Sequence, residues 1–425
     1  MSALDGDAPP VGWSPWRAVV GFGVVSLAAD MVYEGARSVT GPLLAMLGAS
    51  AVLVGVITGA GEAMALVLRL AFGSLADRTG RYWTLTMVGY LMTAVCVPAL
   101  AIAPLVGGGG LVLACVLILA ERTGKAVRSP AKTSLLAHAA GAVGLGRGFA
   151  VHKALDQVGA VAGPLLVAAI AALAGSLWPA LAALVIPGAI AIGLLVWIRS
   201  RMGDPADYGN PPPRATESGS TLTPTPPAAT SARGLSVRFW LFAASAGAAT
   251  AGLVTFGVIS YHLTRERVVP VAAVPVVYAA AMAAAALAAL GTGWAYDRWH
   301  GRVLLALPPL VAAVPALAFS NSPLTAVVGV LAWGAAVGVQ DSTVKALVAD
   351  LVPTGRRATA YGAFAAVQGA AALAGGAMAG ALYTTSVPTL VAAVVVIQLV
   401  ALILLVITLR LRANPDVVVE ARNHS

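Results

Sequence analysis

Long apolar stretches recur along almost the whole chain, and they constrain its fold more than any other feature. A helix that crosses the hydrocarbon core of a bilayer needs about 20 mostly apolar residues. Runs of that kind, separated by turn signals, fall at about 17–46, 51–75, 82–104, 109–128, 147–174, 178–199, 237–263, 270–294, 302–320, 323–350, 355–383 and 386–410. The sequence therefore predicts an all-α protein that crosses a membrane about twelve times.

The composition excludes a soluble globular protein. Of the 425 residues, 59% are hydrophobic and 10% are charged, whereas a soluble domain carries about a quarter charged residues. The formal charge of +9 would indicate nucleic acid as a partner of a soluble protein, but here it comes from loop arginines and lysines, so we expect none. Cys96 and Cys115 both lie in apolar runs and are expected to be small packing residues. We predict no disulfide, metal site or cofactor.

A polar gap at about Arg201–Gly234 divides the apolar runs into two groups of six. It is rich in Pro, Ser and Thr and has no apolar periodicity, which is typical of a flexible linker. The predicted organisation is an N-terminal tail (1–16), a first six-span half (17–199), a linker (200–236), a second six-span half (237–412) and a C-terminal tail (413–425). The first span should bend near Gly41 and Pro42, because proline kinks a helix.

The basic residues between spans are distributed unevenly. Most arginines and lysines flank the termini, the linker and every second loop, and the opposite side has only Arg265 and Arg267, between the seventh and eighth spans. Cytoplasmic loops of membrane proteins carry this excess of positive charge. We therefore predict a multi-pass protein of the cell membrane, with both termini and the linker in the cytoplasm.

A short loop motif occurs once in each half. The chain from Gly73 to Arg81 reads Gly-Ser-Leu-Ala-Asp-Arg-Thr-Gly-Arg, and the chain from Gly293 to Arg302 repeats its Gly-x3-Asp-Arg core. The first copy resembles the signature loop of the major facilitator superfamily, and the second resembles the weaker copy usual in that family. The matching residues are Gly73, Asp77, Arg78, Gly80, Arg81, Asp297 and Arg298.

The resemblance extends over about residues 17–412. It implies two pseudosymmetric six-helix halves, transport of a small molecule by alternating access, and action as a monomer. In the family the first loop contacts the start of span 11, near Gly355 and Arg356 here. Asp77 would cap that helix and pair with Arg356, which would close the cytoplasmic side in the outward-open state, and Asp297 would meet the region of Arg147. The alternative is a solvated turn that only follows the charge bias of the loops.

Span 5 carries a second motif, which reads Gly159-x3-Gly163-Pro164. It is similar to an element of the drug–proton antiporter branch of the family, and that resemblance implies export. The branch tends to place another glycine after the proline, whereas Leu165 and Leu166 follow here. The alternative is a seam of small residues that lets two helices approach closely.

Ionisable residues inside a membrane are costly, so each is a candidate for function. Asp30 and Glu34 are our candidate proton carriers, because burial favours a protonated carboxyl group whereas the nearby cations favour a charged one. Spans 1, 4, 7 and 10 line the central cavity in the family, and the charged or polar candidates on them are Arg37, Arg122, Lys125, Gln340 and Asp341.

The same charges have a structural interpretation, as ion pairs that only hold spans 1, 2, 4 and 5 together. We prefer that interpretation for Glu62 with Arg69 and for Lys153 with Asp156. Arg122 and Lys125 are open between structure and substrate binding. Arg128 and Lys132 lie near the cytoplasmic edge, where long basic side chains reach the headgroups as anchors.

The leading functional hypothesis is a proton-coupled exporter of small, partly apolar molecules. One alternative is an uptake or exchange permease whose span 4 cations bind an anionic metabolite. A second alternative, of another class, is a membrane receptor that transports nothing. An enzyme is not expected, because the sequence contains no G-x-S-x-G, H-E-x-x-H, P-loop or cysteine cluster.

Overall fold

The structure is a computed structural model that describes residues 14–141, 143–202, 235–353 and 356–411, and all regular secondary structure within these ranges is helical. Most of the predicted linker and of both tails lies outside the described residues. Ten apolar helical stretches are long enough to cross a membrane, and two of them, Tyr82–Ala140 and Val271–Ala318, have 59 and 48 residues. Each of these two suffices for two crossings at about 20 residues per crossing, which gives the predicted twelve.

The first half consists of six crossings. Its helices are α1 (Pro15–Ser38), α2 (Thr40–Met46), α3 (Ala51–Thr79), α4 (Tyr82–Ala99), η1 (Leu100–Gly109), α5 (Gly110–Ala140), α6 (Leu145–Ala174), α7 (Leu177–Ala183) and α8 (Val185–Met202). The first crossing breaks at Val39, just before the predicted bend, and Pro42 lies in the first turn of α2, where a missing N–H costs little.

The second half repeats this pattern. Its helices are α9 (Val237–Gly252), α10 (Phe256–Arg265), η4 (Val271–Ala273), α11 (Val274–Trp299), η5 (His300–Ala306), α12 (Leu307–Ala318), α13 (Pro323–Val339), the π-helical turn η6 (Gln340–Val344), α14 (Lys345–Leu351), α15 (Arg357–Thr385) and α16 (Val387–Arg410). Its first crossing is also broken, between α9 and α10. The two halves are therefore built alike.

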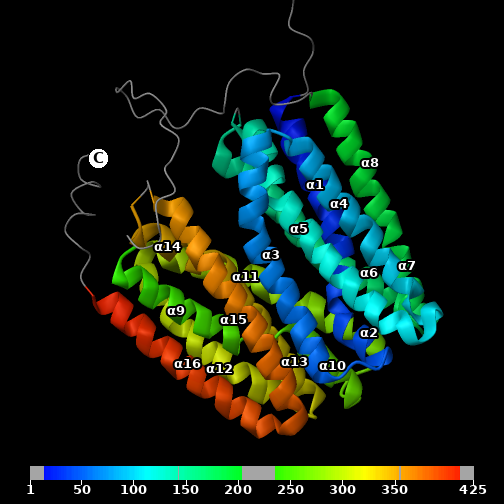
Figure 1. Cartoon of the computed structure of the whole chain (residues 1–425), viewed down its shortest axis with the longest axis vertical. Coiled ribbons are helices and arrows are strands. Elements are labelled where there is room, and N and C mark those ends of the chain that lie inside the picture. The colour runs from blue at the N-terminus through cyan, green and yellow to red at the C-terminus, as the bar shows by residue number, and fades with distance from the viewer. Residues whose placement is uncertain (1–13, 142, 203–234, 354–355, 412–425) are drawn as a thin grey trace, which may run out of the picture.

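The halves meet mainly along three helix pairs, which are α3 with α15, α6 with α11, and α2 with α10. Figure 1 shows α3 and α15 side by side. Glycines allow the close approach. A side chain at Gly55 of α3 would overlap the backbone of Gly376 in α15, and one at Gly41 would overlap the backbone of Gly257. Contacts between small residues are the usual means by which helices associate inside a membrane.

The apolar cores show where the halves are joined and where they separate. One core includes residues of both halves, among them Leu43 of α2 and Phe256 of α10. Two further cores each belong to one half only. The shared core lies at the end of the molecule that contains α2 and α10. The halves separate toward the other end. We call it the basic end because the last turns of α3, α8, α11 and α16 lie there and contain Arg78, Arg199, Arg298 and Arg410.

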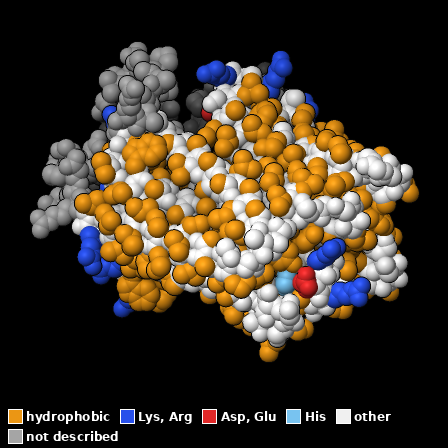
Figure 2. All heavy atoms as spheres, turned by 60° about the horizontal axis from the view of Figure 1, so that its bottom comes forward, with side chains coloured by type: hydrophobic (Ala, Val, Ile, Leu, Met, Phe, Trp, Pro, Cys, Tyr) orange, Lys and Arg blue, Asp and Glu red, His pale blue; other side chains and the backbone are white. Residues whose placement is uncertain are grey.

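The outer surface is apolar, as a lipid-facing surface must be. Figure 2 shows many hydrophobic side chains on the face in view, with charged side chains in a few places. Leu173 and Leu105 are 89% and 83% exposed, which is expensive in water and favourable in lipid. The predicted multi-pass membrane architecture is confirmed.

Candidate functional site

A cavity of about 460 Å³ lies between the two halves. Its walls come from α1, α3, α5 and α6 on one side and from α9, α11, α13 and α15 on the other. It extends from Thr255, next to the shared core, to Lys132 and Lys153 on the side of the basic end. Because the shared core closes the other end, the cavity is open toward the basic end.

The two walls of the cavity differ in chemistry. The wall from the first half is lined with charged side chains, which are Asp30, Glu34, Arg37, Glu62, Arg69, Lys125, Arg128, Lys132, Lys153 and Asp156. The wall from the second half is mainly apolar or neutral, with Met282 and Trp333 among its large side chains and Asp341 as its charged residue. Candidates from both halves, including Gln340, thus face one cavity.

Glu62 is the centre of an ion-pair network at the deep end of the cavity. Its Oε1 lies 2.7 Å from Nη2 of Arg37 and 3.7 Å from Nη1 of Arg122. The expected pair of Glu62 with Arg69 is wrong. Seven residues along a helix span about 10 Å, and Arg37 reaches Glu62 from α1 instead. The Nε of Arg69 is buried and has no hydrogen-bond partner among the described residues.

Two cations of α5 contact the ring of Tyr33, which lies on α1. The Nζ of Lys125 lies 3.5 Å from the centroid of its ring, and Arg122 lies over the same ring and donates a hydrogen bond to its hydroxyl group. Such cation–π contacts stabilise a cation that has left water. Arg122, which we expected at the cavity, is buried and does not line it, and its Nε also lies 3.7 Å from Glu121. Lys125 does line the cavity.

The predicted headgroup anchors on α5 are wrong. Arg128 is only 4% exposed, donates a 2.5 Å hydrogen bond to Thr93, and approaches Asp30 to 3.9 Å. Lys132 donates a 3.0 Å hydrogen bond to Ser26 of α1. The basic stripe of α5 faces α1 and the cavity rather than the membrane surface, because the carboxylate and hydroxyl partners lie there.

Asp30 has a neighbour that the sequence did not reveal. Asp156 of α6 lies close enough for the two carboxyl groups to share a hydrogen bond. Such a bond requires a proton on one of the two groups. The expected pair of Lys153 with Asp156 is also present, at 2.9 Å. Asp156 therefore connects an exposed lysine with the half-buried Asp30.

Glu34 connects the two halves. Its Oε2 accepts a 2.5 Å hydrogen bond from the hydroxyl group of Tyr278 in α11 and lies 3.9 Å from Arg37. Both Glu34 and Tyr278 are buried. Tyr278 belongs to an aromatic cluster with Phe256 and Trp333, at centroid distances of 4.5 and 6.1 Å from it. Tyr278 was missed because a single tyrosine in an apolar run gives no sequence signal.

The Gly159-x3-Gly163-Pro164 element lies in α6 against α1. A side chain at Gly159 would overlap the backbone of Leu27, and one at Gly163 the backbone of Met31. These contacts fit the interpretation as a packing seam. Asp156 precedes Gly159 and Gly163 by three and seven residues, so the same face of α6 brings it to Asp30. That spacing is the sequence signal that could have identified Asp156.

The signature loops lie at the basic end. Gly80 ends α3 with φ +66°, a left-handed conformation that favours glycine, and the following Tyr82 donates a 3.4 Å hydrogen bond to Asp77. Asp77, Arg78, Asp297 and Arg298 are exposed. The exposed Arg356 precedes α15, whereas the neighbouring Gly355 lies outside the described residues. In this open arrangement the predicted closure through Asp77 and Arg356 stays a prediction for another state.

Comparison with known protein families decides the identity of the fold. The family model described as Major Facilitator Superfamily matches residues 25–308 and 256–424. The chain belongs to the Major Facilitator Superfamily. It is therefore a transporter and not an enzyme, and the hypothesis of a receptor that transports nothing finds no support. Together the two overlapping matches cover most of the chain.

Relatives and solved structures agree with this assignment. Uncharacterised proteins of Mycobacterium tuberculosis (strain ATCC 25618 / H37Rv) and Mycobacterium bovis are 51% identical to the chain over 393 residues, which is 92% of this chain and 93% of theirs. The crystal structure of the nucleoside transporter NupG is similar with a TM-score of 0.67 and 14% identity, over 93% of this chain and 100% of its own.

Two further structures have the same fold. A mutant of the peptide transporter POT in complex with sulfate gives a TM-score of 0.68 at 15% identity, over 92% of this chain and 94% of its own. An inward-facing, occupied bacterial homologue of the human lysosomal transporter Spinster gives a TM-score of 0.66 at 16% identity, over 94% of this chain and 98% of its own. At these identities the likeness concerns the fold alone.

Proposed function

We propose that this Major Facilitator Superfamily member is a proton-coupled exporter of small, partly apolar molecules. The observation that carries the proposal is the Glu34–Tyr278 hydrogen bond, which joins the two halves through a buried carboxylate at 2.5 Å. A carboxylate that holds the halves together makes their separation depend on its protonation. The proposal places the basic end in the cytoplasm, in agreement with the positive-inside rule.

The coupling step in this proposal is a proton transfer among carboxyl groups of the first half. Asp30 lies one helical turn from Glu34 toward the basic end, and its partner Asp156 extends the path to the exposed Lys153. A hydrogen bond to a charged carboxylate is about twice as strong as one to a neutral group. Protonation of Glu34 would weaken its bond to Tyr278. The two halves could then separate at the end that contains α2 and α10, which is closed in this structure.

The substrate class follows from the two walls of the cavity. The second-half wall offers Met282, Trp333 and Leu253 to an apolar part, and the polar first-half wall faces it. A cavity of about 460 Å³ is at the lower end of the range of small-molecule sites. The direction, export, rests on the similarity of Gly159–Pro164 to the drug–proton antiporter element.

Closure of the basic end completes the proposed cycle. When the halves rock so that the cavity opens on the other side, Asp77 would reach the start of α15 and pair with Arg356, and Asp297 would act in the pseudosymmetric position. A carboxylate at the N-terminal end of a helix is stabilised by the helix dipole. The chain is proposed to act as a monomer, because each chain contains both halves of the cavity.

The experiment is an accumulation assay in bacteria that lack their own efflux pumps. Cells that express the protein are loaded with a panel of fluorescent lipophilic compounds, with and without an uncoupler. Lower accumulation of at least one compound, restored by the uncoupler, is the expected result. Lower accumulation that persists with the uncoupler would contradict proton coupling, and no effect on any compound would contradict export of this class.

A second candidate function is an uptake or exchange permease for an anionic metabolite. It is favoured by Lys125, which lines the cavity and contacts the Tyr33 ring, with no carboxylate within 4.0 Å of its amino group among the described residues. Such a cation is available to an anionic group. Exchange of a labelled organic anion in proteoliposomes without any ion gradient, abolished by Lys125→Gln, would support this candidate over the exporter.

A further inference from the structure

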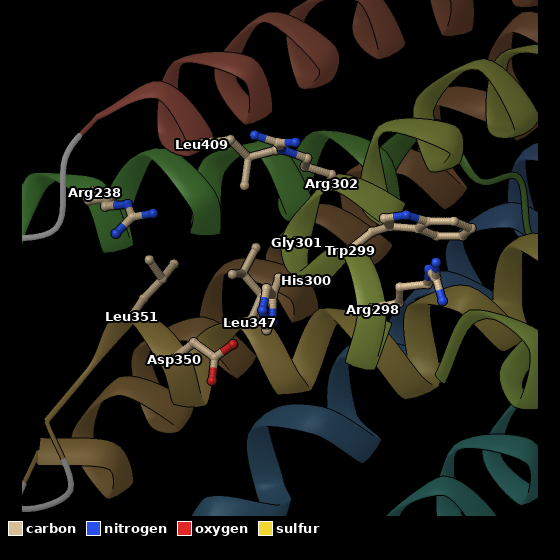
Figure 3. Close-up of a pocket in the computed structure, with 10 residues that line it drawn as sticks. All are labelled: Arg238, Arg298, Trp299, His300, Gly301, Arg302, Leu347, Asp350, Leu351 and Leu409. Carbon is tan, nitrogen blue, oxygen red and sulfur yellow. The ribbon is translucent and has the colours of Figure 1, made fainter. Parts of the chain in front are cut away.

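A second pocket, of about 390 Å³, lies at the basic end of the second half. It is formed by the start of α9, the end of α11, η5, α14 and the end of α16, and Figure 3 shows the side chains around it. It shares no described lining residue with the cavity between the halves. The two are therefore distinct pockets.

The pocket is strongly cationic. Arg238, Arg298 and Arg302 line it together with His300, and Asp350 is the only carboxylate among its described lining residues. One oxygen of Asp350 already accepts a 2.6 Å hydrogen bond from Tyr296. Arg298 and Arg302 are exposed and form no ion pair within the part of the chain that the structure describes. Two arginines thus present unpaired guanidinium groups, which match the geometry of phosphate oxygens.

A turn of the backbone at His300 and Gly301 forms one side of the pocket. His300 has φ +48°, a left-handed conformation that turns the chain from α11 into η5. A Cβ atom at the following Gly301 would lie 2.9 Å from Leu409 and 3.2 Å from Leu347, so these leucines pack closely against the turn. Leu347 and Leu409 also line the pocket, which gives the cationic site an apolar side.

Two tryptophans show the depth of this pocket in the membrane. Trp294 and Trp299 of α11 are 68% and 52% exposed and form an edge-to-face pair with centroids 6.3 Å apart. Trp299 lines the pocket itself. Exposed tryptophans of membrane proteins concentrate at the level of the lipid headgroups. The pocket therefore lies where phosphate groups of lipids are found.

We propose that this pocket binds the phosphate group of an anionic phospholipid. The free arginines take the phosphate, and the apolar side formed by Leu347 and Leu409 accommodates the adjoining part of the lipid. Basic pockets between helices on the cytoplasmic side are suited to anionic headgroups. Inorganic phosphate has the same recognition chemistry, so the experiment includes both sources.

The test uses the purified full-length chain and native mass spectrometry, with phosphatidylglycerol or phosphatidylcholine added at equal concentrations. Wild type is expected to retain phosphatidylglycerol in preference. The double variant Arg298→Gln/Arg302→Gln should lose that preference by on the order of tenfold. The matched control Arg199→Gln/Arg201→Gln removes the same charge from the end of α8, at the basic end of the first half. This control should keep the preference for phosphatidylglycerol.

A parallel arm measures the thermal stability of the same proteins with inorganic phosphate in place of lipid. Stabilisation of wild type by phosphate, absent in the Arg298→Gln/Arg302→Gln variant and without selective lipid retention, would support the phosphate site and assign it to free phosphate. Equal retention of phosphatidylglycerol by wild type and this variant, with no effect of phosphate, would overturn the proposal.

Discussion

Asp30→Asn is expected to abolish transport against a gradient while transport down a gradient continues. The amide cannot take up or release a proton, so the shared site of Asp30 and Asp156 can no longer carry one. A membrane potential of 100 mV supplies about 2.3 kcal/mol per charge, which corresponds to roughly a 50-fold concentration ratio at 1.4 kcal/mol per tenfold. The measurement is substrate accumulation in everted vesicles. In Asp30→Asn the ratio of the substrate concentrations inside and outside should fall to about one.

The control is Glu266→Gln, which makes the same chemical change at an exposed position outside the cavity, and it should leave accumulation unchanged. A purely structural role for Asp30 gives another pattern. Arg128, 3.9 Å away and buried, would lose its partner, so stability and downhill transport would fall together. That combined loss would show that Asp30 holds the helices together and does not carry a proton.

Gly163→Val is expected to destabilise the first half strongly. Gly163 of α6 lies against the backbone of Met31 in α1, so a side chain can be placed there only if the two helices move apart. Overpacking in a close-packed interior costs typically about 1–3 kcal/mol and sometimes more. The midpoint of thermal unfolding, measured on the purified protein in detergent, should fall by several degrees, and downhill transport should fall with it.

Gly193→Val is the matched control for this substitution. Gly193 lies within α8 and is not packed against another helix, because a Cβ atom at this position would have no neighbouring atom within 4 Å. Both variants have the same change in helix propensity, so the difference between them measures the packing of α6 against α1. Equal unfolding midpoints for the two variants would refute the close approach at Gly163.

The membrane architecture could be predicted from the sequence because its signals are local. A run of about 20 apolar residues is sufficient to indicate a crossing, and the Gly73–Arg81 loop indicated the turn after α3 that Gly80 makes. The break of the first crossing at Val39 was predicted within a few residues from Pro42. Each of these inferences needs only neighbours in the sequence.

The partners of the membrane charges were much less predictable. Spacing showed that Glu62 and Arg69 share a face of α3, but it could not show that Arg37 of α1 would reach Glu62 first. The sequence likewise predicts that Arg128 and Lys132 of α5 reach the headgroups, whereas Arg128 contacts Thr93 and Asp30. A stripe identifies a face of a helix, and the rotation of that helix in the bundle decides which neighbour the face meets.

Contacts between the halves were out of reach of the sequence. Tyr278 and Glu34 are 244 residues apart and meet only because α11 crosses α1 at the shared core. By contrast, Asp156 was within reach, because it shares the face of α6 that carries Gly159 and Gly163. A seam of glycines fixes which helix a face approaches, and it therefore also locates the polar residues on that face.

The most direct test of proton coupling is a measurement of proton movement itself. The purified protein is reconstituted in liposomes that contain a pH-sensitive dye, and a gradient of a compound exported in the accumulation assay is imposed without any initial pH difference. We predict that protons move opposite to the compound in wild type and that Asp30→Asn abolishes this movement. Flux of the compound through wild type with no accompanying change of internal pH would contradict proton-coupled transport by this chain.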